Sequence, residues 1–352
     1  MSPIYLDYNA TAPLREAAFA AMTQILRQTG NASSVHRAGR GARRVLEEAR
    51  EVVADHLVVS PRGVIFTSGG TEANNMALRG FPGRRVLASA VEHPSVLKGP
   101  VDRVIPVDRD GIVDLKALED GLDGGLVSVM LANNETGVIQ PIAEVIDIAH
   151  RHGALVHVDA VQALGKMQIP QGADLISLSA HKIGGPQGVG ALVLTDPDLD
   201  LAAHSTGGGQ ERWHRAGTEN IAGIAGFAAA LRDLGDIEAE AARLAALRDR
   251  IEAAVPEAVR FGHRVERLPN TSCLAIPGQK AQTLLMALDL ESVAVSAGSA
   301  CSSGKLAPSG VLLAMGETDL AGSAIRISLG WGTSETEIDQ FIERFSRVTE
   351  KL

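Results

Sequence analysis

Six short apolar runs recur between residues 64 and 194, and amphipathic stretches separate them. Short, continuously apolar runs are typical of strands that are buried on both faces of a parallel sheet, with helices in the connections. The pattern therefore predicts an α/β fold with a mainly parallel sheet. The predicted strands are Val64–Thr67, Val86–Ala88, Val127–Leu131, Leu155–Val158, Leu175–Leu178 and Gly190–Leu194.

The pattern changes after residue 236. Residues 237–255 predict one long amphipathic helix, with Leu244, Leu247 and Ile251 on one face. We expect this helix to bridge to a second, smaller α/β unit over residues 256–352. The elements expected in that unit are strands at 272–276 and 324–329 and a last helix opened by the capping-box pair Ser334 and Glu337.

Charge and cysteine content narrow the class of ligand. The 352 residues carry 33 basic and 42 acidic side chains, a net charge of −9, which argues against nucleic acid or an anionic membrane as the main partner. No apolar run approaches the ~20 residues that span a bilayer, and residues 1–11 lack an export signal, so we expect a cytoplasmic protein. Cys273 and Cys301 are too few for a disulfide framework or a cysteine-based zinc site, and we expect no metal.

Polar side chains follow the predicted strands, at the sheet edge where parallel sheets bind ligands. The backbone N–H groups of residues 68–74 (SGGTEAN) and the Thr71 hydroxyl suit a phosphate, although an ordinary glycine turn with a helix N-cap fits equally well. His93 and Asn134 follow the next two strands, and a lone histidine is more often structural. Asp159 ends the fourth strand, where a buried carboxylate needs a cationic partner or caps the next helix.

Lys182 follows the fifth strand and precedes a Gly-Gly-Pro turn that would hold it in place. Most lysines are solvated, but a partly desolvated lysine has a lowered pKa and becomes an amine able to form a Schiff base. Five strand ends thus offer a phosphate site, an imidazole, an amide, a carboxylate and an amine. Pyridoxal phosphate needs a lysine, an acid beside its ring nitrogen and an anion site, so one cofactor accounts for all five.

The motifs at these strand ends resemble those of cysteine desulfurases, which belong to the class V aminotransferase group of fold type I pyridoxal-phosphate-dependent transferases. The resemblance runs in family order from residues 5–11 (YLDYNAT) to 325–330 (IRISLG). It implies a large cofactor-binding domain over 14–250 and a small α/β domain formed by 1–13 and 251–352. The other matching stretches are 66–74 (FTSGGTEAN), 133–137 (NNETG), 157–160 (HVDA), 179–182 (SAHK) and 215–220 (RAGTEN).

The resemblance implies a role for each motif residue. Lys182 would bind the cofactor aldehyde, Asp159 would pair with the ring nitrogen, and Gln162 would hydrogen-bond the ring hydroxyl. His93 would stack on the ring and assist proton transfer. The other implied ligands are Gly70, Thr71, Ser179 and His181 for the phosphate, Thr218 for the phosphate of the neighbouring subunit in a homodimer, Asn134 for the cofactor and the substrate carboxylate, and Arg326 for the substrate carboxylate.

Cys301 lies in a stretch rich in small residues, 296–305 (SAGSACSSGK), which predicts a loop. In cysteine desulfurases a cysteine of this loop accepts sulfur, and the surroundings here resemble the group whose long loop carries sulfur to another protein. Cys273 lies in a strand-like run and fits a small buried hydrophobe. The resemblance implies that L-cysteine is converted to L-alanine and a Cys301 persulfide, which a protein such as an iron–sulfur scaffold accepts.

Two alternatives stay open. A selenocysteine lyase, another C–S lyase or an aminotransferase would share the fold; the loop cysteine argues against simple aminotransferases but does not exclude the selenium reaction. A non-catalytic sulfur-relay or adaptor protein would also keep the fold, but every cofactor position holds a competent residue. Tyr8, Ala12 and Gly184 depart from the commoner family pattern, so the sequence determines the cofactor better than the substrate preference or the rate.

Overall fold

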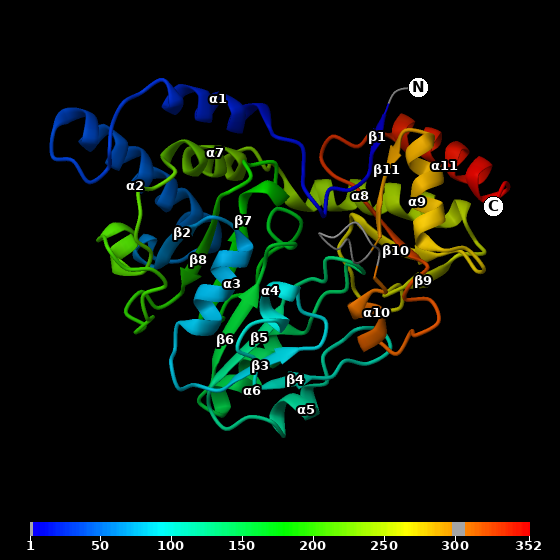
Figure 1. Ribbon diagram of the computed structural model, residues 1–352, viewed down its shortest axis with the longest axis horizontal. Helices are drawn as coiled ribbons and strands as arrows, with labels where there is room; N and C mark the ends of the chain where they lie inside the picture. Colours follow the sequence, from blue (N-terminus) through cyan, green and yellow to red (C-terminus); the bar gives the residue numbers. More distant parts are fainter. Residues whose placement is uncertain (1–2, 298–306) are drawn as a thin grey trace.

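The computed structural model describes residues 3–297 and 307–352 (Figure 1). Its large sheet has the strand order β2-β8-β7-β6-β5-β3-β4. The six strands predicted in this region are confirmed, with ends that differ by at most one residue. The strands are β2 (Val64–Thr67), β3 (Val86–Ser89), β4 (Arg103–Ile105), β5 (Leu126–Met130), β6 (Leu155–Asp159), β7 (Leu175–Ser179) and β8 (Gly190–Leu194).

One strand of the large sheet runs against the others. β8 is antiparallel to both of its neighbours, β7 and β2, whereas the remaining neighbours pair in parallel. Only residues 180–189 connect β7 to β8, and a parallel crossover needs a dozen or more residues. The chain therefore turns back directly after Lys182. The prediction of a mainly parallel sheet is confirmed, and its last strand is the antiparallel exception.

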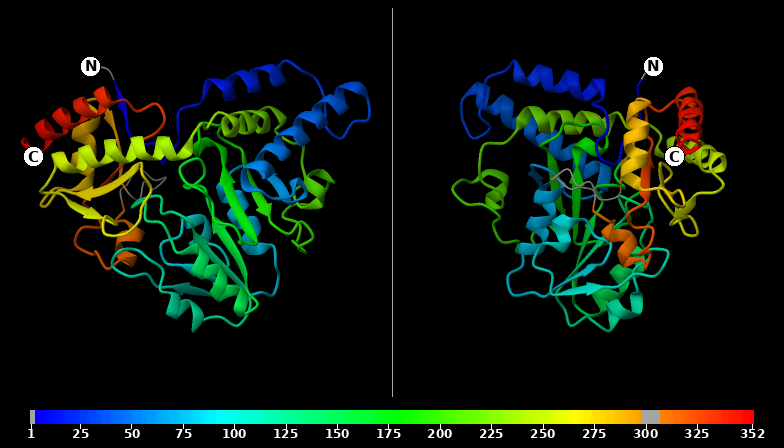
Figure 2. Two further views of the ribbon diagram at one scale, coloured as in Figure 1. Left: turned by 180° about the vertical axis from the view of Figure 1, so that it is seen from behind. Right: turned by 45° about the vertical axis from the view of Figure 1, so that its right-hand side comes forward.

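Helices cover both faces of the large sheet (Figure 2). Successive strand side chains point to opposite faces, so Val64 and Phe66 pack in one core with α2, α6 and α7, while Ile65 packs in another with α3. The sheet is thus the middle layer of an α/β arrangement. The helices of this part are α1 (Glu16–Leu26), α2 (Arg37–Leu57), α3 (Gly70–Arg79), α4 (Pro94–Leu97), α5 (Leu115–Glu119), α6 (Ile142–Arg151) and α7 (Ile221–Arg232).

A second, antiparallel sheet has the order β12-β13-β10-β9 and its own apolar core. The predicted strands at 272–276 and 324–329, the helix at 237–255 and the Ser334–Glu337 capping box are all confirmed. Its elements are α8 (Ile237–Ala254), β9 (Val259–Phe261), β10 (Thr271–Ala275), α9 (Ala281–Leu290), β12 (Ser296–Ala297), α10 (Gly310–Ala314), β13 (Ala324–Ser328) and α11 (Glu335–Thr349).

The N-terminus joins this second core. β1 (Ile4–Tyr5) pairs in parallel with β11 (Val293–Ala294), and Ile4 is buried in the same core as Leu244 and Leu247 of α8. The predicted division at residues 13 and 250 stays a prediction, and the packing of α8 favours a boundary before residue 237. No helix in the two described stretches is both long and apolar enough to cross a membrane.

Candidate active site

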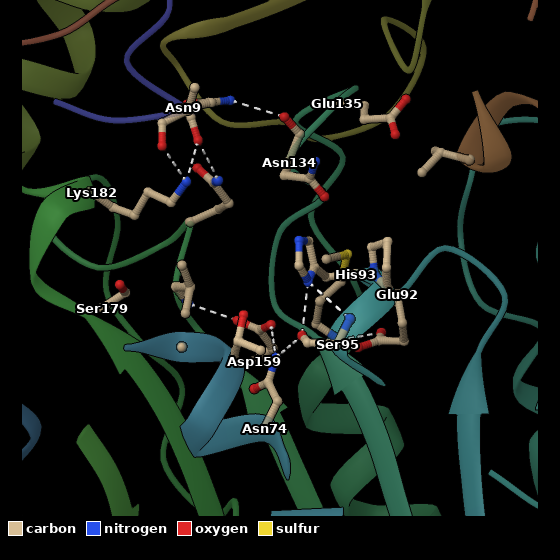
Figure 3. A pocket seen from close by; sticks show the side chains of 18 of the residues that line it. Asn9, Asn74, Glu92, His93, Ser95, Asn134, Glu135, Asp159, Ser179 and Lys182 are labelled. Carbon is tan, nitrogen blue, oxygen red and sulfur yellow. Dashed lines mark hydrogen bonds between the residues drawn. The ribbon is translucent and has the colours of Figure 1, made fainter. Parts of the chain in front are cut away.

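A cavity of about 510 Å³ lies where the carboxyl ends of the large sheet face the second sheet (Figure 3). The large sheet contributes residues that follow β3, β5, β6 and β7, and the second sheet contributes residues of β12 and β13. The chain thus brings together side chains that are far apart in sequence. The sequence-predicted site residues that line the cavity are Gly70, Thr71, His93, Asn134, Asp159, Gln162, Ser179, His181, Lys182 and Arg326.

Lys182 ends a short 3₁₀ turn directly after β7. Its Nζ donates hydrogen bonds to the backbone carbonyls of Asn9, at 2.6 Å, and Ala10, at 2.8 Å. Burial, and next the positive charge of Arg326, lower the pKa of Lys182 from 10.5 to about 8. The cavity therefore contains an amine that is partly neutral, and hence nucleophilic, near neutral pH.

Gly184, one of the three departures from the commoner family pattern, lies in the turn after Lys182, and its surroundings explain why a glycine stands there. Its φ is +80°, and an added Cβ would lie 2.9 Å from the Pro13 carbonyl oxygen and 2.7 Å from Cγ of Arg15. Any larger residue would be strained in this conformation and would push against the N-terminal segment. Glycine here allows that segment to pack closely behind Lys182.

Asp159 is a buried carboxylate, only 4% exposed, at the end of β6. Its Oδ2 accepts a hydrogen bond of 2.7 Å from Nδ2 of Asn74, and its Oδ1 accepts one of 3.0 Å from the backbone N–H of Val161. No lysine, arginine or histidine of residues 3–297 and 307–352 forms an ion pair with it. Among the described residues the carboxylate therefore has no cationic partner, and it suits a cationic group of a ligand in the cavity.

The anion end of the cavity is built at the start of α3. Gly69 is the N-cap, with φ of +149° and no side chain to cap the first turn, so the N–H groups of this turn are available to a ligand. Gly70 must lack a side chain, because an added Cβ would lie 2.7 Å from Cγ2 of Val161. Ser179 and His181 line the same end. The segment is thus the glycine turn that the sequence offered as one alternative, and its free N–H groups keep the anion site a prediction.

Arg326 of β13 lines the cavity, and both terminal nitrogens of its guanidinium donate hydrogen bonds within the protein. One donates to the Asn134 carbonyl at 3.0 Å and the other to Oδ1 of Asp7 at 2.6 Å. Its Nε is buried and has no hydrogen-bond partner among the described residues. The guanidinium is therefore held rigidly beside the cavity with donor capacity to spare.

Two predicted residues lie outside this group. Thr218 is exposed and does not line the cavity of its own chain, so its role toward a neighbouring subunit stays a prediction. Cys301 lies outside the described residues. Cys273 is 1% exposed in β10, and burial raises the pKa of its thiol, which confirms that it is a buried hydrophobe.

Asn9 is a site residue that the sequence interpretation missed. It is 1% exposed, and its carbonyl accepts hydrogen bonds from both Lys182 and Nε2 of Gln162. Lys166 donates to Oε1 of Gln162 at 3.1 Å, and burial, followed by the charge of Lys182, lowers the pKa of Lys166 to about 7. The signal for Asn9 was its place in the matching motif YLDYNAT, whereas no local pattern marks Lys166.

Two buried acids at the cavity wall were also missed. Oε1 of Glu92 accepts a hydrogen bond from the backbone N–H of Met130, and burial raises the pKa of Glu92 well above its ordinary value. Glu135 accepts a hydrogen bond from the Ser309 hydroxyl, and burial raises its pKa as well. The matching stretch 133–137 contains Glu135, and Glu92 directly precedes His93, but the burial of both acids follows only from the folded structure.

The sequence and the fold of this chain have counterparts among known proteins. Residues 4–341 match the model of the family described as "Aminotransferase class-V". The chain belongs to the class V aminotransferase family. As a class V aminotransferase it is 42% identical to a cysteine desulfurase of Cereibacter sphaeroides, over 100% of this chain and 97% of that protein.

One more curated relative and one solved structure support the same family assignment. Cysteine desulfurase IscS of Dictyoglomus turgidum is 40% identical over 99% of this chain and 95% of its own length. The X-ray structure of a NifS-like protein from Rickettsia africae matches with a TM-score of 0.92 and 34% identity, over 99% of this chain and 100% of that chain. The fold type I architecture predicted from the sequence is confirmed.

The cofactor of the chain is pyridoxal phosphate, in keeping with its family, and the cavity fits it. Lys182 supplies an amine with a lowered pKa, Asp159 supplies a buried carboxylate without an ion pair among the described residues, and the start of α3 supplies uncapped backbone N–H groups that suit an anion. Pyridoxal phosphate carries an aldehyde, a protonated ring nitrogen and a phosphate, one group for each.

Proposed function

We propose that the chain is a cysteine desulfurase, which removes sulfur from L-cysteine to give L-alanine and passes it to an acceptor protein through a Cys301 persulfide. One observation carries the proposal. In a chain that matches cysteine desulfurases over its whole length, one cavity holds a lysine with a lowered pKa and a carboxylate that forms no ion pair with any described residue. A non-catalytic adaptor would have no reason to keep either group buried.

The cofactor, when bound, supplies an electron sink that stabilises negative charge at the substrate carbon bearing the amino group. Lys182 would hold the cofactor and then, once the substrate amine has displaced it, move the proton of that carbon. Asp159 would keep the ring nitrogen protonated, and Asn74, which donates to Asp159, would hold that carboxylate in position. Gln162 has one N–H on the Asn9 carbonyl and a second one for the ring hydroxyl.

Arg326 and Asn134 would bind the substrate carboxylate. The guanidinium keeps its ion pair with Asp7, so the substrate would share the arginine with Asp7 rather than replace it. The backbone carbonyl of Asn134 accepts the hydrogen bond from Arg326, so the side chain of Asn134, which lines the cavity, is available to the substrate.

Sulfur transfer needs a thiolate that attacks the substrate sulfur. We assign the attack to Cys301: its sulfur forms a bond with the substrate sulfur while the carbon–sulfur bond breaks, and the electron pair of that bond remains on carbon. The carbon then takes up a proton and becomes the methyl group of alanine. Ala297, four residues before Cys301 in sequence, lines the cavity, which places the start of this segment at the site.

The reaction is tested by measuring alanine and sulfide released by the holoenzyme from L-cysteine in the presence of a thiol reductant. We expect equal amounts of the two products. L-selenocysteine is assayed in parallel, because the selenium reaction was left open by the sequence. Turnover of selenocysteine with no turnover of cysteine would show that the chain is a selenocysteine lyase instead. Release of no alanine from either substrate would support the non-catalytic adaptor protein.

The assembly and partners are also proposals. We propose a homodimer with shared active sites, supported by the exposed position of Thr218 and by large apolar side chains left exposed on α1, Phe19 and Leu26. The acceptor is proposed to be an iron–sulfur scaffold, because relatives of this chain carry the name cysteine desulfurase IscS. The predicted cytoplasmic location stays a prediction.

The lowered pKa of Lys182 predicts how the apoprotein captures its cofactor. Only the neutral amine attacks an aldehyde, and a pKa of about 8 in place of 10.5 makes the neutral form abundant at lower pH. We expect the rate of capture to rise with pH and to level off above about 8. The rate is followed by the absorbance of the lysine-bound cofactor. A rise that continues to pH 10.5 would show that Lys182 is an ordinary solvated lysine.

A further inference from the structure

The ring of His93 has one nitrogen whose role is fixed by geometry. The backbone N–H of Ser95 donates a 3.1 Å hydrogen bond to Nδ1 of His93. A backbone N–H can only donate, so Nδ1 must present its lone pair. In the neutral ring the single proton therefore lies on Nε2, the nitrogen on the side away from Ser95.

The side chain of Ser95 supports the same assignment through a chain of hydrogen bonds (Figure 3). Asp159 only accepts, so the amide of Asn74 must present Nδ2 to it, at 2.7 Å. The same Nδ2 donates to Oγ of Ser95 at 2.9 Å, which makes that oxygen an acceptor. The Ser95 proton is then directed to Nδ1 of His93, 2.8 Å away. Each hydrogen bond in the chain from Asp159 to His93 therefore has a single possible assignment of donor and acceptor.

The neutral ring is the relevant form. Burial lowers the pKa of His93, the positive charge of Lys182 lowers it further, and Asp159 opposes both. The unperturbed pKa of 6.5 already leaves most rings neutral above pH 7. Protonation at Nδ1 would also turn a proton toward the Ser95 N–H, so the local geometry opposes it.

We propose that Ser95 is a positioning residue that holds neutral His93 with its proton on Nε2, so that the ring offers the cavity a hydrogen-bond donor and not a base. The inference rests on the proposed function, because it states what His93 gives to the reacting atoms of that site. His93 then donates a hydrogen bond from Nε2 to the substrate or cofactor, while Lys182 is left as the base. A base role of His93 toward the Cys301 thiol does not fit this tautomer.

The tautomer is read directly by long-range hydrogen–nitrogen correlation spectra of the holoenzyme labelled with ¹⁵N-histidine, since protonated and unprotonated ring nitrogens resonate far apart. The His93 signals are those that disappear in His93→Gln. We expect an unprotonated Nδ1 and a protonated Nε2 in the wild type. A protonated Nδ1 would overturn the proposal.

Three substitutions separate positioning from folding. Ser95→Ala removes the hydroxyl but keeps the backbone N–H, and we expect the ratio of the two tautomers to shift by about fivefold, the scale of one hydrogen bond. We expect kcat to fall by less than this factor, because kcat follows the fraction of rings that carry the proton on Nε2, with little change in KM. Ser95→Thr, the matched control, keeps the hydroxyl and should retain the wild-type spectrum. Ser95→Asp places an acceptor-only carboxylate beside the ring, against the backbone N–H, and should raise the fraction of rings that are protonated at Nδ1.

A loss of kcat in Ser95→Ala without any shift of the tautomer ratio would show that Ser95 has only a structural role. An unchanged spectrum together with an unchanged kcat would show that the Ser95 hydroxyl does not position His93. The spectra do not depend on turnover. If the wild type releases no alanine, the proposed function fails, while the nitrogen spectrum of the same sample still decides the tautomer.

Discussion

Replacing Cys301 by alanine is expected to abolish sulfur transfer, whereas replacing Cys273 is expected to leave it intact. The chain has two cysteines, and burial raises the pKa of the Cys273 thiol because β10 places it in an apolar core. Only a thiolate attacks sulfur, so Cys273 is excluded as the acceptor. We expect Cys301→Ala to lose persulfide formation and alanine release by about 10³-fold or more, the scale of removing an enzyme's nucleophile.

Cys273→Ala is the matched control, because it removes the other thiol. It should lower the free energy of unfolding by about 1 kcal/mol, a usual value for a core substitution, and should keep the persulfide. The persulfide is measured by alkylating the protein after a single exposure to L-cysteine and mapping the added sulfur. Added sulfur on Cys273, or alanine formed at full rate by Cys301→Ala, would refute the assignment of the acceptor.

Replacing Lys182 by alanine is expected to lower alanine release by about 10³- to 10⁴-fold, because the proton-transfer group and the covalent attachment are lost together. Cysteine turnover and the absorbance of the bound cofactor are the measurements. Free amines should restore part of the activity, since a small amine enters the space that the side chain leaves.

Lys182→Arg distinguishes the amine from its charge. Arginine keeps the positive charge and the capacity to donate to the Asn9 and Ala10 carbonyls, but its guanidinium stays protonated and forms no Schiff base. We expect it to be as inactive as Lys182→Ala. Activity in Lys182→Arg near that of the wild type would mean that this lysine acts only through its charge.

The strands of the large sheet were predictable because both of their faces are buried. Every residue of β5 and β7 is buried, which produces continuous apolar runs. β4 was missed because two of its three residues are exposed, and β1, β11 and β12 are only two residues long. The antiparallel direction of β8 depends on the length of one connection, which the apolar pattern does not report.

The site was predictable where it follows strand ends. Asp159 and Lys182 each come directly after a buried strand, and a parallel sheet gathers such residues at one edge. Asn9 was missed because its contacts join it to Gln162 and Lys182, more than 150 residues away. Ser95 was missed because its importance lies in the direction of hydrogen bonds to His93, and sequence spacing does not contain that direction.

The central claim is that the amine of Lys182 is joined to pyridoxal phosphate, and one measurement tests it most directly. The holoenzyme is reduced with borohydride, digested, and mapped by mass spectrometry. Lys166 is the internal comparison, because its pKa is also lowered and it bonds to Gln162 at the edge of the same site. We expect the mapped peptides to carry the reduced cofactor on Lys182 alone. Label on Lys166, or no labelled lysine in a protein that retains its cofactor, would contradict it.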